Sequence, residues 1–94
     1  MRRPIANATV SSVDDSASSV TLSAANGIRQ GWSCFNDSSE ALYIKFGATA
    51  STTSFTVKVA AGAYYEMPEP IYCGVIDGIW AANSTGAARI TELS

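Results

Sequence analysis

The sequence contains no histidine, which excludes Ser-His and Cys-His nucleophile systems and zinc sites built on imidazole. It has only two cysteines, Cys34 and Cys73, which lie far apart and within apolar, strand-like patterns. In a small secreted domain they would be paired, but the N-terminal residues lack the apolar run of a secretory signal. We therefore expect two buried free thiols rather than a disulfide.

Charge is also scarce. Charged residues make up 15% of the chain, against about 25% in ordinary proteins. Ser, Thr, Ala and Asn must cover much of the surface, so we expect part of it to be buried against other chains. An ordinary Ser/Thr-rich β-protein is the alternative interpretation.

The partner classes that need charge or long apolar runs are not indicated. The net charge is −2, and apart from Arg2-Arg3 the basic residues are scattered singly, so the sequence predicts no nucleic-acid partner. No apolar run approaches the about 18–20 residues of a membrane span, so we expect no membrane partner either.

Short stretches with apolar residues at alternate positions, separated by Gly, Pro, Asn, Asp and Ser, occupy most of the chain. This spacing predicts a sandwich or barrel, and no window has a helical period. We expect an all-β fold with little or no helix: a single small β-sandwich, jelly-roll-like or similar, of seven to eight short antiparallel strands. The expected strands are 8–13, 18–23, 28–36, 41–47, 54–59, 63–67, 75–82 and 87–93, with a short edge piece at 71–73.

The strands 8–13 and 18–23 flank the turn residues Asp14-Asp15, so we expect them to form a hairpin. Residues 1–7 are expected to form a flexible N-terminal arm before a single sandwich domain at 8–94. Trp32 and Phe35 are expected in the core, and Phe55 is expected to point inward. Gly31 and Gly78 interrupt strand patterns, which is typical of a bulge or of a close approach by another backbone.

Acidic residues offer the only candidates for chemistry. Glu66 and Glu69 flank Pro68 and could form a carboxylate pair for glycoside chemistry, and Asp14-Asp15 could bind a cation together with Asp77 or Glu92. Surface charge and turn formation explain both groups better, because no known metal-binding loop or catalytic motif accompanies them. We therefore predict no enzymatic activity, no cofactor and no metal.

Aromatic residues concentrate in the second half of the chain. Tyr64, Tyr65, Tyr72 and Trp80 could form a platform for sugar rings, but tyrosines at a subunit contact are the favoured interpretation. Adjacent residues of a strand point to opposite faces, so Tyr64 and Tyr65 cannot both be buried in one core. The candidate interface residues are Arg2, Arg3, Ile5, Tyr64, Tyr65 and Tyr72.

The chain also resembles a widespread group of small proteins of tailed phages and prophages, over the stretch from Trp32 to Leu93. The order of the matching segments is more specific than any one of them, and 8–13 with 19–22 also fits. The segments are Asn36-Asp37-Ser38, Ala41 to Ser51, Ser54 to Val59, Gly62 to Pro68, Gly78 to Ala81 and Gly86 to Leu93.

This resemblance implies a small virion-associated β-sandwich assembled in the host cytoplasm. Within that group we expect a head decoration (cement) protein that binds the major capsid protein or other virion proteins and forms a homo-oligomer, a trimer. The N-terminal arm would clamp a neighbour, and strand 8–13 could extend a neighbour's sheet. The alternatives are a tail, neck or fibre-associated structural module and a carbohydrate-binding module.

Overall fold

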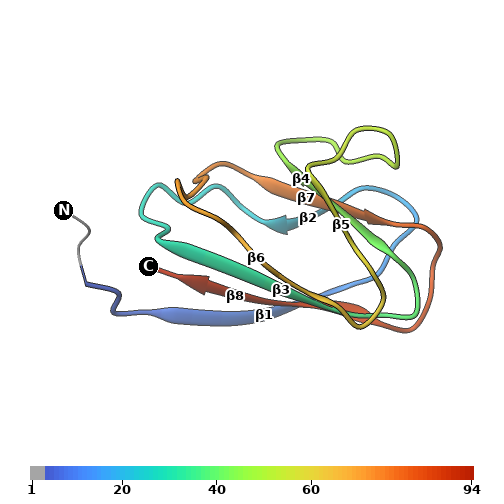
Figure 1. Cartoon of the computed structure of the whole chain (residues 1–94), viewed down its shortest axis with the longest axis horizontal. Helices are drawn as coiled ribbons and strands as arrows, with labels where there is room; N and C mark the ends of the chain where they lie inside the picture. The colour runs from blue at the N-terminus through green and yellow to red at the C-terminus, as the bar shows by residue number, and fades with distance from the viewer. Residues whose placement is uncertain (1–3) are drawn as a thin grey trace.

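The computed structural model of the chain describes residues 4–94 and contains two four-stranded antiparallel sheets packed face to face (Figure 1). The candidate interface residues Arg2 and Arg3 lie outside the described residues. The strands are β1 (Ala8–Asp14), β2 (Val20–Ser23), β3 (Gly31–Asp37), β4 (Leu42–Phe46), β5 (Val57–Val59), β6 (Tyr64–Glu66), β7 (Ile76–Trp80) and β8 (Ala87–Leu93).

The strand order makes the sandwich a jelly roll. Sheet A has the order β1-β8-β3-β6 and sheet B the order β2-β7-β4-β5. The first strand therefore pairs with the last, the second with the second last, and so on: β1 with β8, β2 with β7, β3 with β6 and β4 with β5. This is an antiparallel ribbon folded over into two sheets. The expected all-β sandwich is confirmed, and residues 4–94 contain no helix long and apolar enough to cross a membrane.

The core lies between the sheets and follows the alternation of each strand. Its large side chains are fully or almost fully buried and come from strands of both sheets. The members are Leu22, Trp32, Cys34, Leu42, Ile44, Val59, Met67, Ile76, Trp80, Ala88 and Ile90.

The expected hairpin of the first two strands is wrong, because β1 and β2 belong to different sheets. The segment between them crosses from one sheet to the other. Asp15 fixes this crossing: its carboxylate accepts hydrogen bonds from Ser38 Oγ at 2.7 Å, Ser84 N at 3.0 Å and Gly86 N at 3.2 Å. Asp14 and Asp15 therefore do mark the end of the first strand. The connection that follows them crosses to the other sheet and is not a hairpin turn.

Two residues expected in the core lie partly outside it. Phe35 follows the buried Cys34 on β3, and alternation turns its side chain to the outer face. Phe55 precedes β5 and packs against the Tyr43 ring on the outside of sheet B, with ring centroids 4.9 Å apart. The expected edge piece at 71–73 is not a strand.

Gly31 and Gly78, the glycines that interrupt the strand patterns, lie in different surroundings. Gly31 is paired with Leu93 without any register shift, and a Cβ there would lie 3.0 Å from Leu93 Cδ1. At Gly78 a Cβ would lie 2.8 Å from Leu22 Cδ1 and 3.1 Å from Leu42 Cδ1, so a larger residue would have to displace these side chains of the neighbouring strands. The register irregularity near this contact falls between Thr21 and Ser23 of β2, not on β7.

Candidate functional site on the outer face of sheet A

The outer face of sheet A carries exposed apolar side chains from several strands. Val10 of β1 is 74% exposed, Tyr64 of β6 is 60% exposed, and Phe35 of β3 is 39% exposed. Phe35 and Tyr64 are register partners, so both side chains lie on the same face of the β3–β6 pair. Exposed large apolar groups that gather on one sheet face are typical of an interaction surface.

Polar groups divide this surface, because Arg89 and Thr91 of β8 lie between Val10 and Phe35 in the register of sheet A. Arg89 of β8 makes an exposed ion pair with Asp37 of β3 at 3.0 Å and donates to Ser12 Oγ of β1 at 3.0 Å. Tyr64 Oη donates a long hydrogen bond to a Glu66 carboxylate oxygen at 3.4 Å. The surface therefore combines apolar side chains with charges that already have partners within the chain.

An open groove of about 680 Å³ continues the surface toward the N-terminal residues. It lies where β3, β6 and β8 meet the segment that follows β6. Apolar and polar groups both line it: Ile5, Trp32, Tyr64, Met67, Pro68, Ile71 and Leu93 with Gln30, Gly31, Ser33, Glu66, Glu69 and Thr91.

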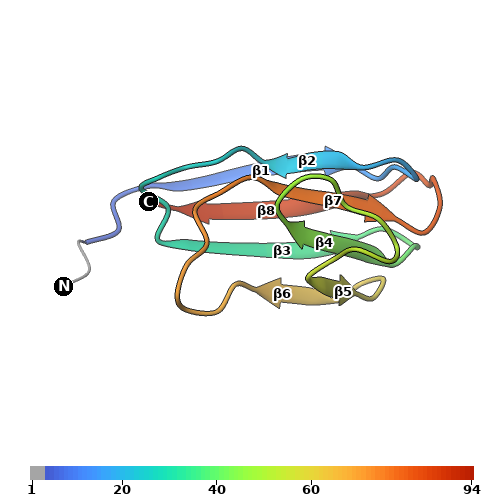
Figure 2. The ribbon, with the colours of Figure 1, turned by 90° about the horizontal axis from the view of Figure 1, so that it is seen from above.

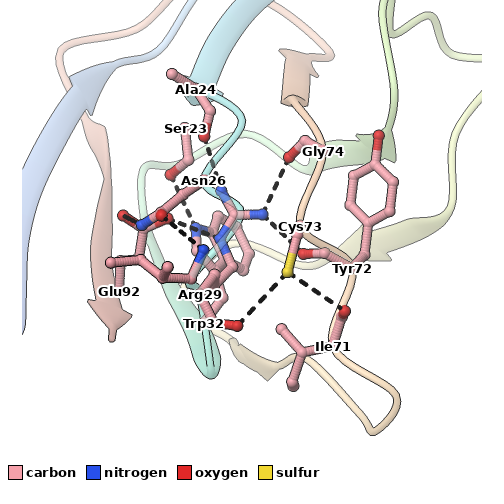
Figure 3. Close-up of polar contacts among 11 residues, drawn as sticks. Ser23, Ala24, Asn26, Arg29, Trp32, Ile71, Tyr72, Cys73, Gly74 and Glu92 are labelled. Atoms are coloured by element: carbon pink, nitrogen blue, oxygen red, sulfur yellow. Dashed lines mark hydrogen bonds and ion pairs between the residues drawn. The ribbon is translucent and has the colours of Figure 1, made fainter. Parts of the chain in front are cut away.

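A buried arginine holds the backbone of Tyr72 and Gly74 (Figure 3), which follows the groove-lining residue Ile71. Arg29 Nε contacts a Glu92 carboxylate oxygen at 2.7 Å. Its remaining donors reach backbone carbonyls from two loops: Tyr72 O at 2.7 Å, Gly74 O at 3.0 Å and Ala24 O at 2.8 Å. The guanidinium thus joins β8, the β2–β3 loop and the 71–74 segment, and it is a structural group because its donors are used within the chain.

The structure separates the predicted interface tyrosines. Tyr64 points outward, whereas Tyr65 points inward and meets the Trp32 ring edge-on, with centroids 6.4 Å apart. Burial raises the pKa of Tyr65. Tyr72 stacks on Phe46 with centroids 5.1 Å apart, away from Tyr64.

The aromatic platform considered for sugar binding is therefore not assembled on one surface. Trp80 is 1% exposed, and its indole N–H donates to Asn36 Oδ1 at 3.1 Å inside the sandwich. Of the predicted interface residues in the described part of the chain, Tyr64 and Ile5 face the groove, while Tyr65 and Tyr72 pack against other aromatic rings.

The acidic candidates also fall into separate places. Glu66 and Glu69 both line the groove. Asp15 holds the crossing described above, and the hydrogen bond from Ser38 is the largest cause that lowers its pKa. Within residues 4–94 no group of three or more His, Cys, Asp and Glu side chains is arranged to hold a metal ion.

Asp77 is the one acidic residue of the described chain that is buried. It is 6% exposed on β7, and its Oδ1 has no hydrogen-bond partner within residues 4–94. Lys45 is its register partner on β4, but Lys45 Nζ donates to Thr49 O and Ser54 Oγ instead. This carboxylate lies on sheet B and does not contribute to the surface on sheet A.

Both cysteines are free thiols, as expected from the sequence, but only Cys34 is buried as expected. Cys34 has no exposed surface, and burial raises its pKa to about 12. Cys73 is partly exposed beside the Arg29 cluster.

Sequence reasoning missed Arg29 because a single arginine in a strand-like pattern resembles a surface charge.

The fold and this surface define a class: a small jelly-roll domain with an open, partly apolar outer sheet face. Comparison of the chain with protein-family models, with curated proteins and with solved structures finds no match.

Proposed function

We propose that this chain is a non-enzymatic structural protein of a phage virion, acting as a decoration protein that stabilises the head shell through contacts with the major capsid protein. The observation that carries the proposal is the outer face of sheet A, where Val10, Phe35 and Tyr64 remain exposed. A surface of this kind loses unfavourable contact with water only when another chain covers it. The phage resemblance of the sequence supports the virion as the place where this happens.

The proposed mechanism is binding without a reaction. A decoration protein that binds the assembled shell more tightly than free subunits shifts the equilibrium toward the assembled shell by mass action. The exposed rings would supply the apolar contact, and the low charge of the chain suits broad contacts between subunits. Self-association belongs to the same proposal, as does the absence of nucleic-acid and membrane partners. The trimer is what the resemblance implies, and attachment to the shell does not depend on that number of copies.

The location is tested by gold-labelled antibody against this chain on particles from the source lysate, viewed by electron microscopy. We expect label over the whole head. Label at one pole or along the tail would favour the alternative, a neck, tail or fibre-associated module. No label on any particle would contradict the virion proposal, and glycan binding at Tyr64 would then be tested with a Tyr64→Ala variant.

The binding surface is tested with two matched variants. Phe35 and Phe55 are both 39% exposed, but Phe35 lies on the outer face of sheet A and Phe55 on the outside of sheet B. We expect Phe35→Thr to weaken attachment to undecorated heads at least tenfold, about 1.4 kcal/mol, in a co-sedimentation titration. Phe55→Thr should bind like the natural chain. Equal loss in both variants would contradict the proposed surface.

A further inference from the structure

Among residues 4–94, no further strand pairs with the outer edge of β1, the longest edge strand of the sandwich. Four strands lie at sheet edges, β1 and β6 in sheet A and β2 and β5 in sheet B, and Figure 2 shows β1 and β6 at opposite edges. β1 has seven residues, whereas β2 has four and β5 and β6 have three each. An edge strand presents unpaired backbone groups to another chain, and the number of these groups grows with its length.

The hydrogen bonds at the start of β1 identify which backbone groups are open. Asn7 N donates to Ser94 O at 2.9 Å, and Ser94 N donates to Asn7 O at 3.0 Å. These two residues form a hydrogen-bonded pair of the antiparallel ladder, so Thr9, Ser11 and Val13 also turn their backbone groups toward β8. The N–H and C=O groups of Ala8, Val10 and Ser12 therefore point away from sheet A.

This edge lacks the features that protect natural edge strands. Residues 8–13 include no charged residue and no proline. The pairing of β1 with β8 runs through all seven residues without a register shift, whereas the β2 edge has an irregularity. Long, regular and uncharged edges are the ones that accept a further strand.

We propose that two copies of this chain pair through their β1 edges, antiparallel about a two-fold axis, with Val10 opposite Val10 of the second copy. This register is the one that places the open groups of residues 8, 10 and 12 opposite one another and also brings the two most exposed apolar side chains together. The two sheets A would form one continuous eight-stranded sheet.

The chemistry of β1 favours a second copy over a different protein. In the proposed register Ala8 faces Ser12 of the second copy, so small side chains oppose small side chains. Asp14, the charged residue of β1, lies beyond the paired residues and faces no like charge. Recognition of a foreign strand depends on pockets for its alternate side chains, and the side chains of residues 8–12 are too small to form such pockets.

The contact differs from the self-association considered above. A pair of identical edges related by a two-fold axis is closed, so it joins two copies and forms no ring of three. We therefore infer a dimer in place of the trimer implied by the resemblance. The inference does not depend on a virion location, and because the paired edge is short we expect a weak dimer with a dissociation constant between about 1 µM and 1 mM.

The first test is sedimentation equilibrium across this concentration range. We expect a monomer–dimer equilibrium for the natural chain and a monomer for Val10→Pro. Proline at position 10 removes an N–H that points away from β8, so the ladder within the chain keeps its hydrogen bonds. Val10→Thr retains the N–H and a branched side chain, and it should keep at least part of the dimer.

The second test measures register and does not depend on the proline variant. In a Cys73→Ser background, Ala8→Cys and Ser12→Cys chains are mixed and treated with a short bismaleimide. Facing residues have Cβ atoms about 5 Å apart, whereas two copies of position 8 lie roughly 14 Å apart along the strand. We expect crosslinked dimers from the mixture and from Val10→Cys alone, and almost none from Ala8→Cys or Ser12→Cys alone.

Several results would overturn the dimer. These are a monomer at all concentrations, a trimer, a dimer that persists unchanged in Val10→Pro, or crosslinking of Ala8→Cys alone as efficient as that of the mixture. None of these results concerns attachment to heads. Failure of the dimer can therefore be distinguished from failure of the virion proposal.

Discussion

At the scale of single residues, the two thiols differ in their surroundings. Cys34 lies in the core with its pKa raised to about 12, and Cys73 is partly exposed. Since the thiolate is the reactive form, Cys34 should resist alkylation in the folded protein. We expect mass spectrometry after iodoacetamide treatment at pH 8 to show one label per folded chain, at Cys73, and two after denaturation. Rapid labelling of Cys34 in the folded protein would contradict the described core.

The carboxylate of Asp15 makes stability depend on pH. Its pKa is lowered in the folded protein, chiefly by the Ser38 hydrogen bond, so it favours folding wherever it is ionised in both states. This contribution is present above about pH 4, the ordinary aspartate pKa, and is lost as the pH falls through the lower folded value.

We therefore expect Asp15→Asn to melt at a lower temperature than the natural chain at pH 7. The difference should shrink as the pH falls below about 4, and it should be smallest below the lowered folded pKa of Asp15, where both chains carry a neutral side chain at position 15. Thermal melts followed by circular dichroism between pH 7 and pH 2 measure it. Asp14→Asn on the same strand end controls for the loss of one negative charge. A difference independent of pH would show that the carboxylate charge is not responsible.

At the scale of elements, two arginine–carboxylate pairs provide a direct comparison. Arg29 and Glu92 have side chains that are 0% and 22% exposed, whereas Arg89 and Asp37 are 51% and 52% exposed. Removing one member of a buried pair leaves its partner and several carbonyl groups without hydrogen bonds in a poorly solvated place. When one member of an exposed pair is removed, water solvates the remaining member instead.

We expect Arg29→Met to lower the free energy of unfolding by about 3–5 kcal/mol. Arg89→Met should lower it by less than about 1 kcal/mol. Urea denaturation at equal ionic strength compares the two variants. Equal losses would contradict the structural role given to the Arg29 cluster, in which it holds the 71–74 segment beside the groove.

The sequence predicts the strands better than their partners. Alternation located the strand at 42–46 within one residue at each end and the strand at 87–93 without error, because both have one face in the core. The same alternation places Phe35 on the opposite face from Trp32 and Cys34, although its size suggested a core position. Local pattern carries little information about pairing, so the neighbouring runs of β1 and β2 were wrongly expected to form a hairpin.

Buried polar residues were the hardest part of the site to predict. Asn36 belongs by composition to the turn Asn36-Asp37-Ser38, yet it is fully buried. Its side-chain amide donates to Glu40 O at 2.9 Å and Val59 O at 3.0 Å, and it accepts the Trp80 indole N–H. Apart from the nearby Glu40 carbonyl, these partners are distant in sequence, so no local signal distinguishes Asn36 from a turn residue.

At the scale of the whole molecule, one face and one edge of the same sheet carry the two proposals. The outer face of sheet A is proposed to meet the shell, and the β1 edge is proposed to meet a second copy. Paired edges would place two such faces side by side in one surface. Binding through two linked faces strengthens attachment beyond that of one face when both can engage at once.

The position of β8 in sheet A has a consequence for synthesis. β8 is the last strand along the chain but lies between β1 and β3 in the sheet, and it pairs with all seven residues of both. Until a ribosome has released these residues, β1 has no partner in its sheet and the outer face of sheet A does not exist. A chain interrupted before residue 87 would therefore lack both proposed contacts, so only copies that contain β8 would be able to join an assembly.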